Sequence, residues 1–237
     1  MDGDRPPQQP GADRDAADDR LHDRRCRHQP GVELDLAAAA GADDGEDRWE
    51  KRRGLFMDVI RQNNPDVIGL QEAAIWRERP AGSDAEVVAW DFLELLLGEL
   101  RSADCEYAVA IASDRAELAV PTGDADEVSE VRLTMRDVIL VREGLAVRGS
   151  GSARCDANIS IEVAGIALAP ERGYQWIDVA MGEQSVRIIN THLESLSADL
   201  TLAQALELLH ALPQDRPVVV LGDFNADPLD DAPREGS

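Results

Sequence analysis

Three apolar segments of the chain each lead into polar side chains that could carry out chemistry. They are residues 68–72, 186–193 and 218–227. The first ends in the carboxylate of Glu72, the second brings His192 near its end, and the third runs into Asp223 and Asn225. Binding and catalytic groups gather where rigid strands end and loops begin. These four side chains are therefore the candidate functional residues.

The residue types suit the hydrolysis of a phosphoester. A carboxylate such as Asp223 can take or orient the proton of an attacking water, while the amide of Asn225 donates to a phosphate oxygen. Asp223 and Asn225 are two residues apart, so both side chains point to the same side of the sheet if the strand continues to Asn225. Glu72 would hold a hard cation such as Mg²⁺ through oxygen, with water at the other positions, and His192 would donate to the developing charge.

Each of these residues alone is more often structural than functional. A Glu after a strand and an Asp after a Gly are usually turn residues, and a single His is more often a satisfied structural side chain. The functional interpretation therefore depends on all four occurring together.

The elements that must position these residues are typical of a mixed α/β domain. Helical spacing of apolar residues predicts helices over residues 49–63, 86–101 and 198–211. A short buried strand is predicted from Asp66 to Gln71, and a last strand leads to Asp223. Further strand-like runs cover residues 107–112, 131–134, 138–142, 159–163, 176–181 and 185–192. Alternation at both ends around a strand-rich middle predicts α/β layers.

The first 30 residues differ from the rest. They hold seven Asp, six Arg and four Pro and show no periodic apolar pattern. This composition is typical of a disordered segment, or of a wrongly chosen start or a frame error in the gene. We therefore divide the chain into residues 1–30 and one folded domain over residues 31–237.

The overall charge restricts the partners. The chain has 237 residues, 43% of them apolar, and 47 acidic against 24 basic residues give a net charge of −23. Affinity for DNA normally comes from Lys and Arg that neutralise phosphates. The acidity therefore favours a small phosphoester over long DNA, and if the substrate is a phosphoester, a bound metal must supply much of the positive charge.

The sequence also restricts location and redox chemistry. No run of 18 apolar residues is present, so no membrane span is predicted, and the N-terminus lacks the pattern of a secretory signal. The sequence as it stands predicts a cytoplasmic protein, or a secreted one if the anomalous N-terminus has replaced a signal peptide. The three cysteines, Cys26, Cys105 and Cys155, match no zinc or redox spacing.

Three motifs in one order carry a family resemblance. Pro65-Asp-Val-Ile-Gly-Leu-Gln-Glu72, Asn190-Thr-His-Leu-Glu194 and Gly222-Asp-Phe-Asn-Ala226 together resemble the endonuclease/exonuclease/phosphatase family. The segment Asp44–Arg53 is similar to the stretch after the first strand in bacterial members, and the resemblance covers about residues 43–230. It implies a four-layer α/β sandwich, in which two central mixed sheets are flanked by helices. It also implies a divalent-metal site at the strand ends, for Mg²⁺ or Mn²⁺.

The resemblance implies roles for particular residues. Glu72 resembles the metal-ligand glutamate, and His192 the histidine that contacts the scissile phosphate in the nuclease-like branch. Asp223 resembles the aspartate that orients the water, and Asn225 the asparagine that grips the phosphate. Asp35 stands about where the family's first strand ends in an Asn that helps to place metal and phosphate.

Three more residues lie where the family often adds polar groups to the site. They are Arg136, Asp137 and Asn158, of which Arg136 and Asn158 are candidate phosphate contacts. For all three, a position on the surface is the commoner alternative.

One motif of the family has no counterpart in the sequence. The family ends with an Asp-His or similar pair on a final strand, and no His occurs after His210 here. The sequence therefore predicts a fold that is incomplete at its C-terminal end, with low stability or activity. The leading interpretation is a metal-dependent phosphoester hydrolase with direct attack of water on phosphorus. The alternative is a truncated, non-catalytic relic or binding module that retains the fold.

Overall fold

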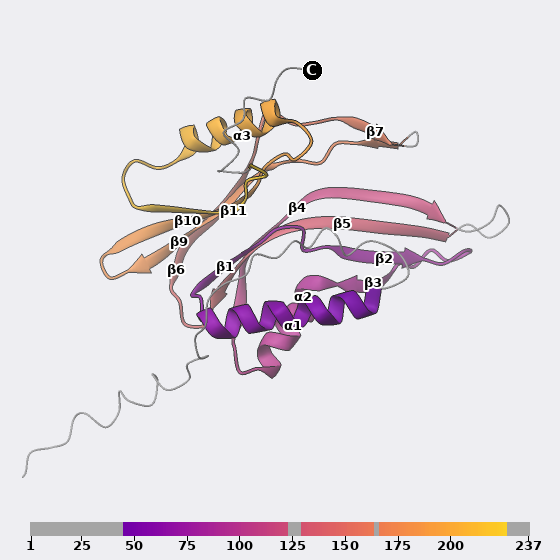
Figure 1. Ribbon diagram of the computed structural model, residues 1–237, viewed down its shortest axis with the longest axis horizontal. Helices are drawn as coiled ribbons and strands as arrows, with labels where there is room; N and C mark the ends of the chain where they lie inside the picture. The colour runs from indigo at the N-terminus through magenta and orange to yellow at the C-terminus, as the bar shows by residue number, and fades with distance from the viewer. Residues whose placement is uncertain (1–44, 123–128, 164–165, 227–237) are drawn as a thin grey trace, which may run out of the picture.

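The computed structural model describes the backbone of residues 45–122, 129–163 and 166–226. Two β-sheets stack face to face, with α1 (Gly45–Asn63) and α2 (Phe92–Ser102) below one sheet and α3 (Ala198–Ala211) above the other (Figure 1). The order of layers is helices, five-stranded sheet, four-stranded sheet, helix. The expected four-layer α/β sandwich is therefore confirmed.

The five-stranded sheet is built around one long strand. Its members are β1 (Val67–Leu70), β2 (Ile75–Arg79), β3 (Val87–Asp91), β4 (Tyr107–Thr122) and β5 (Ser129–Arg142). One edge of β5 pairs with β4 along nearly its whole length, and the other edge pairs with β2 and then with β1, all antiparallel. The register of β4 shifts between Asp114 and Ala116, a bulge that redirects a side chain.

The four-stranded sheet has the order β11-β10-β9-β6. Its strands are β6 (Val147–Arg154), β9 (Gly173–Met181), β10 (Gln184–His192) and β11 (Val218–Asp223). Only β10 and β11 are parallel to each other, and α3 makes the crossover that two parallel strands require. A separate hairpin consists of β7 (Ile161–Val163) and β8 (Ile166–Leu168).

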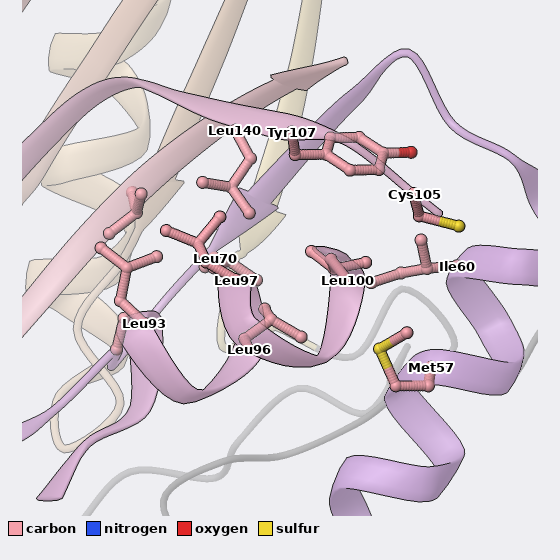
Figure 2. Packing of buried hydrophobic residues seen from close by; sticks show 12 residues of the cluster. Met57, Ile60, Leu70, Leu93, Leu96, Leu97, Leu100, Cys105, Tyr107 and Leu140 are labelled. Atoms are coloured by element: carbon pink, nitrogen blue, oxygen red, sulfur yellow. The ribbon is translucent and has the colours of Figure 1, made fainter. Parts of the chain in front are cut away.

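The larger core lies between the helices and the five-stranded sheet. Leucines of α2 at helical spacing meet Met57 and Ile60 of α1 and the outward side chains of β1 and β5, among them Leu70 and Leu140 (Figure 2). Leu100 of α2 is fully buried at the centre of this cluster. Burial of such side chains contributes about 1.5–3 kcal/mol each relative to leaving them exposed, which fixes the helices on the sheet.

A second, smaller core lies between the two sheets. Ile139 and Val141 of β5 pack against Ile177 and Val179 of β9. The two sheets approach each other closely at Gly69 of β1, where an added Cβ would lie 2.0 Å from Leu221 Cδ1 and 2.6 Å from Asn190 Oδ1. Only a glycine permits this approach of β1 to β10 and β11.

Several predicted elements differ from the structure. Residues 86–101 were expected to be one helix, but Val87–Asp91 is a strand, and the side chain of Asp91 caps α2 by accepting the N–H groups of Leu93 and Glu94. The two runs at 131–134 and 138–142 belong to the single strand β5. Strands β2 and β6 were not expected; β6 is rich in Gly and Ser, which are poor strand formers. The predicted segment 1–30 lies outside the described residues.

Helices 198–211 and 49–63 were predicted with nearly the right ends. Among the residues that the structure describes, no helix combines the length and apolar character needed to cross a bilayer.

Candidate active site

The carboxyl ends of β1, β10 and β11 meet at one end of the sandwich. Gln71, just after β1, donates from Nε2 to Asn190 Oδ1 on β10 at 2.6 Å. Since β10 and β11 are parallel and in register, His192 at the end of β10 lies opposite Asp223 at the end of β11. Three of the four candidate residues are thereby brought to the same end of the fold from distant parts of the chain.

His192 and Asp223 form the centre of this arrangement. His192 Nε2 lies 3.9 Å from Asp223 Oδ2, and the imidazole is 8% exposed while the carboxylate is 52% exposed. This distance is too long for a direct hydrogen bond but leaves both groups within reach of a shared water. The pair therefore presents a buried ring and an open carboxylate at the surface of the site.

A glycine backbone conformation within β11 fixes the orientation of Asp223. Gly222 has φ = +139°, and a Cβ there would lie 1.9 Å from the carbonyl oxygen of Thr191. The backbone carbonyl of Asp223 accepts the N–H of Leu193 at 2.9 Å, which ties the end of β11 to the end of β10. Only a glycine can precede the aspartate in this geometry.

Asn225 lies beyond the end of the strand. Because β11 ends at Asp223 and Asn225 has φ = +47°, the strand does not continue and the alternation expected from the sequence does not apply. The N–H of Asn225 donates to Asp223 Oδ1 at 2.9 Å, and its Nδ2 donates to the carbonyl of Leu193 at 2.8 Å. Its amide therefore holds the turn that carries Asp223.

Glu72 occupies an equally constrained turn after β1. Its φ is +56°, a left-handed conformation that costs a non-glycine residue about 1–2 kcal/mol. The carboxylate of Asp137 accepts the backbone N–H of Glu72. The next residue, Ala73, donates its N–H to the carbonyl of Arg136 at 2.8 Å. Residues of β5 thus hold the turn in place.

Asp137 is buried among positive groups. It is 2% exposed, which corrects the expectation that it lies on the surface, and Arg115 Nε donates to its Oδ2 at 2.8 Å. Burial raises the pKa of Asp137, while the charge and N–H of Arg115, the charge of Arg172 and the N–H of Glu72 act in the opposite direction. Sequence reasoning missed Arg115 entirely, because the pairing of β4 with β5 that brings the two side chains together is a tertiary feature.

Arg136 and Asn158, the candidate phosphate contacts, both make structural contacts. Arg136 donates from Nε to the carbonyl of Ala73 at 2.9 Å and from Nη2 to Asp91 at 2.6 Å. Asn158 accepts the N–H of Arg172 at 2.9 Å and donates to the carbonyl of Cys155. A role for either residue in binding phosphate stays a prediction. Asp35 lies outside the described residues.

A layer of buried amides lies behind the site, between the sheets. Asn190 is fully buried and donates to the carbonyls of Leu70 and Val138 at 3.0 and 3.2 Å. Gln175, also fully buried, accepts from Ser113 at 3.1 Å. The bonds of Asn190 therefore tie β10 to β1 and β5 across the two sheets behind the site.

Glu194, the last residue of the second motif, is structural. It is 1% exposed, and its Oε1 accepts the N–H groups of Ser195 and Leu196 at 2.9 Å. Arg172 lies 3.6 Å from its other oxygen. This carboxylate shapes the loop between β10 and α3 and does not reach the open end of the site.

The donor set fits a weakly chelated hard cation. Mg²⁺ is usually held by one or two carboxylates with several waters, and this end of the sandwich has Glu72, half buried, and the exposed carboxylate of Asp223. Within the described part of the chain, no three His, Cys, Asp or Glu side chains converge as a metal cage. The side chains present suit Mg²⁺ or Mn²⁺ better than a metal that requires a complete protein cage.

Several solved structures are similar to this chain at low sequence identity. An endonuclease/exonuclease/phosphatase family protein from Leptotrichia buccalis C-1013-b superposes with a TM-score of 0.51 at 16% identity, covering 80% of this chain and 64% of that one. A mannosyl-6-phosphatase from Bacteroides thetaiotaomicron VPI-5482 gives 0.47 at 15% identity, covering 86% and 64%. TDP2 from C. elegans gives 0.40 at 18% identity, covering 78% and 46%.

These likenesses concern the fold, and the chain spans less than two thirds of the length of each of these three structures. A comparison with curated protein sequences finds no match. The family model described as "Endonuclease/Exonuclease/phosphatase family" matches residues 39–237, which is most of the chain and includes all three motifs. The chain therefore belongs to the endonuclease/exonuclease/phosphatase family.

Proposed function

We propose that this chain is a divalent-metal-dependent phosphoester hydrolase in which water attacks phosphorus directly. The observation that carries the proposal is the pairing of His192 and Asp223 at adjacent strand ends, 3.9 Å apart, with Glu72 on the third strand end at the same end of the sandwich. A histidine, an open carboxylate and a second carboxylate are the groups that such a reaction needs.

Asp223 is the residue that orients and deprotonates the water. Its Oδ1 is occupied by the N–H of Asn225, which leaves Oδ2 as the oxygen that faces His192 and the solvent. A carboxylate with one oxygen fixed and the other open holds a water in one direction, which favours in-line attack.

His192 and Asn225 act on the phosphate. The imidazole of His192 is buried on one side and reaches toward Asp223, so it donates to an oxygen placed between the two groups. The Nδ2 of Asn225 uses one N–H on the carbonyl of Leu193. An amide nitrogen carries two N–H groups, and the second can donate to a phosphate oxygen.

Glu72 is the proposed metal ligand, with Mg²⁺ or Mn²⁺ as the ion. When bound, the ion supplies positive charge that polarises a phosphate oxygen and stabilises the leaving group. The chain's own part is to hold the carboxylate of Glu72 in one place, through a turn whose backbone is bonded to β5.

The substrate that we propose is a small phosphoester. A net charge of −23 repels a long polyphosphate chain, and high salt would screen this repulsion. Efficient nicking of duplex DNA at low salt, where the repulsion is not screened, would therefore contradict the preference for small substrates.

The test compares hydrolysis of bis(p-nitrophenyl) phosphate, p-nitrophenyl phosphate and a labelled DNA duplex with Mg²⁺ or Mn²⁺. We expect metal-dependent turnover of the small substrates, and in Asp223→Ala a loss of about 3 kcal/mol of transition-state stabilisation, roughly a hundredfold in rate. Asp199→Ala, at an exposed position of α3, is the matched control. Equal rates in Asp223→Ala and wild type would remove Asp223 from the mechanism, and no turnover with metal bound would favour a non-catalytic binding module.

A further inference from the structure

Asp137 and Arg115 are a buried ion pair directly behind the turn that carries Glu72. Arg115 Nε lies 2.8 Å from Asp137 Oδ2, and the side chains are 8% and 3% exposed. Breaking a buried ion pair by removing one partner is strongly destabilising, and an apolar replacement of both is often as stable as the pair. The stability of the fold therefore does not require two charges at this place.

The contacts of Asp137 point toward the site. Its carboxylate accepts the backbone N–H of Glu72, the residue whose φ of +56° departs from the conformations that a glutamate prefers. Asp137 is thus bonded on one side to a buried guanidinium and on the other to the backbone of the proposed metal ligand. A carboxylate fixed by Arg115 cannot follow the turn if the turn relaxes.

The same turn is held from its other side as well. Ala73 is bonded to Arg136 through both its N–H and its carbonyl, at 2.8 and 2.9 Å, and Arg136 is bonded to Asp91 at the start of α2. The contacts of Arg136 fix the residue after Glu72, and those of Asp137 fix Glu72 itself. Removing the Asp137 contact would leave the turn attached while freeing the φ and ψ angles that aim the carboxylate.

From these contacts we infer that Asp137, clamped by Arg115, is a positioning residue that sets the direction of the Glu72 carboxylate for the divalent cation. The inference rests on the proposed function, because it takes Glu72 as the metal ligand. Partners that orient a metal ligand without touching the metal typically change metal affinity by about 10–100-fold when they are replaced. The expected loss on removing Asp137 lies in this range.

The experiment is a titration of the folded protein with Mn²⁺, in which binding is measured by calorimetry and by water-proton relaxation. Glu72→Gln identifies the binding that belongs to the proposed site, since an acidic chain also binds Mn²⁺ elsewhere. Asp137→Asn keeps the shape of the side chain but turns one of its two acceptor oxygens into a donor, so the side chain can no longer accept with separate oxygens from Arg115 and from the Glu72 N–H. We expect this change to weaken the Glu72-dependent binding by about 10–100-fold. Asp178→Asn is the matched control. Asp178 is also buried and bonded to two arginines, Arg187 and Arg216, but it lies away from the carboxyl ends of β10 and β11 that carry the site.

A second variant separates positioning from folding. Arg115→Met combined with Asp137→Leu removes both charges together, so no buried charge is left unpaired, and it still deletes the acceptor of the Glu72 N–H. We expect this double variant to fold and to bind Mn²⁺ about as weakly as Asp137→Asn.

The outcomes are distinguishable. Unchanged Mn²⁺ affinity in the double variant, with a clear loss in Glu72→Gln, would overturn the positioning role and leave the proposed metal site standing. Unchanged affinity in Glu72→Gln would overturn the metal site itself, and with it the inference. A comparable loss in Asp178→Asn would show that the effect comes from general destabilisation, which also overturns the role of Asp137.

Discussion

Replacing Gly222 by alanine tests the geometry that aims Asp223 at His192. Gly222 stands at the end of β11, with φ = +139°, and its backbone lies against that of β10. A methyl group there would lie 1.9 Å from the carbonyl oxygen of Thr191 and 2.9 Å from the carbonyl carbon and the amide nitrogen of the same residue. All three atoms belong to backbone in the middle of a paired sheet, so none can rotate away as the end of a side chain would.

Two costs add up in this variant. A non-glycine residue in a region of φ that is nearly confined to glycine costs about 1–3 kcal/mol. Forcing a methyl group into a filled space costs about 1–3 kcal/mol more, through shifts of the surrounding backbone. We therefore expect the free energy of unfolding to fall by roughly 2–6 kcal/mol, which is a large part of the roughly 5–15 kcal/mol typical of a native domain.

The assay is urea unfolding, read as the midpoint at unchanged slope. Gly98→Ala is the matched control, because Gly98 lies within α2 and no atom lies within 4 Å of the position that its added methyl group would take. The same chemical change should there increase stability by about 0.5–1 kcal/mol. A Gly222→Ala protein that loses less than about 1 kcal/mol would refute the close approach of β11 to β10 and the orientation of Asp223 that depends on it.

Two further predictions concern pKa shifts away from the site. Hydrogen bonds from Arg187 hold the pKa of Asp178 below its usual range, so the stabilising effect of this carboxylate is full above about pH 4 and is lost as the pH falls through the lowered pKa. Asp178→Asn should therefore lower the free energy of unfolding by about 2–3 kcal/mol at pH 7, measured by urea unfolding. A difference in stability between wild type and Asp178→Asn that stays constant down to about pH 2 would contradict this. Burial and the charge of Glu207 raise the pKa of the Cys155 thiol to about 11. In a Cys26→Ser, Cys105→Ala variant, in which Cys155 is the remaining thiol, the native protein at about pH 8 should therefore react with a disulfide reagent at least about 100-fold more slowly than the same variant unfolded in urea. Equal rates in the two conditions would show that the thiol is not protected.

The layers and the order of the motifs could be predicted because both depend on local signals. Apolar periodicity located α1 and α3 within a few residues of their observed ends, and Pro65 marked where the first helix stops. The apolar run before Asp223 located β11. Signals of this kind depend only on consecutive residues, and tertiary packing stabilises the helices and strands that they predict.

Pairing between distant segments could not be predicted from those signals. Residues 87–91 have a helical pattern of apolar side chains but form β3, because β2 offers a partner edge and Asp91 provides a better helix start. Strand β6 consists of poor strand formers and exists because β9 pairs with it along its whole length. In both cases tertiary hydrogen bonds outweigh intrinsic propensity.

The candidate site likewise contains residues that local signals predict and residues that they do not. Glu72, His192 and Asp223 could be proposed as a group because each ends an apolar strand, and the structure brings those three strand ends together. The alternation argument did not predict the place of Asn225 in the turn, because β11 ends at Asp223, two residues before Asn225. Which of these side chains act on a substrate stays a proposal for the kinetic comparison of Asp223→Ala with wild type.

Arg115 and Asp137 illustrate why the rest of the site cannot be read from the sequence. Alternation along β5 directs Ile139 and Val141, and therefore Asp137, into the space between the sheets, where a carboxylate is costly unless it is paired. Its partner comes from β4, where Ser113 pairs with Asp137 and Arg115 follows two residues later on the same face of the sheet. The requirement for a cation can be argued once β5 is known to be a central strand, but the identity of that cation depends on which residues of β4 the pairing places beside Asp137. A charged residue within an otherwise apolar strand is therefore a sequence signal for a buried partner, and the register of the neighbouring strand decides which residue fulfils it.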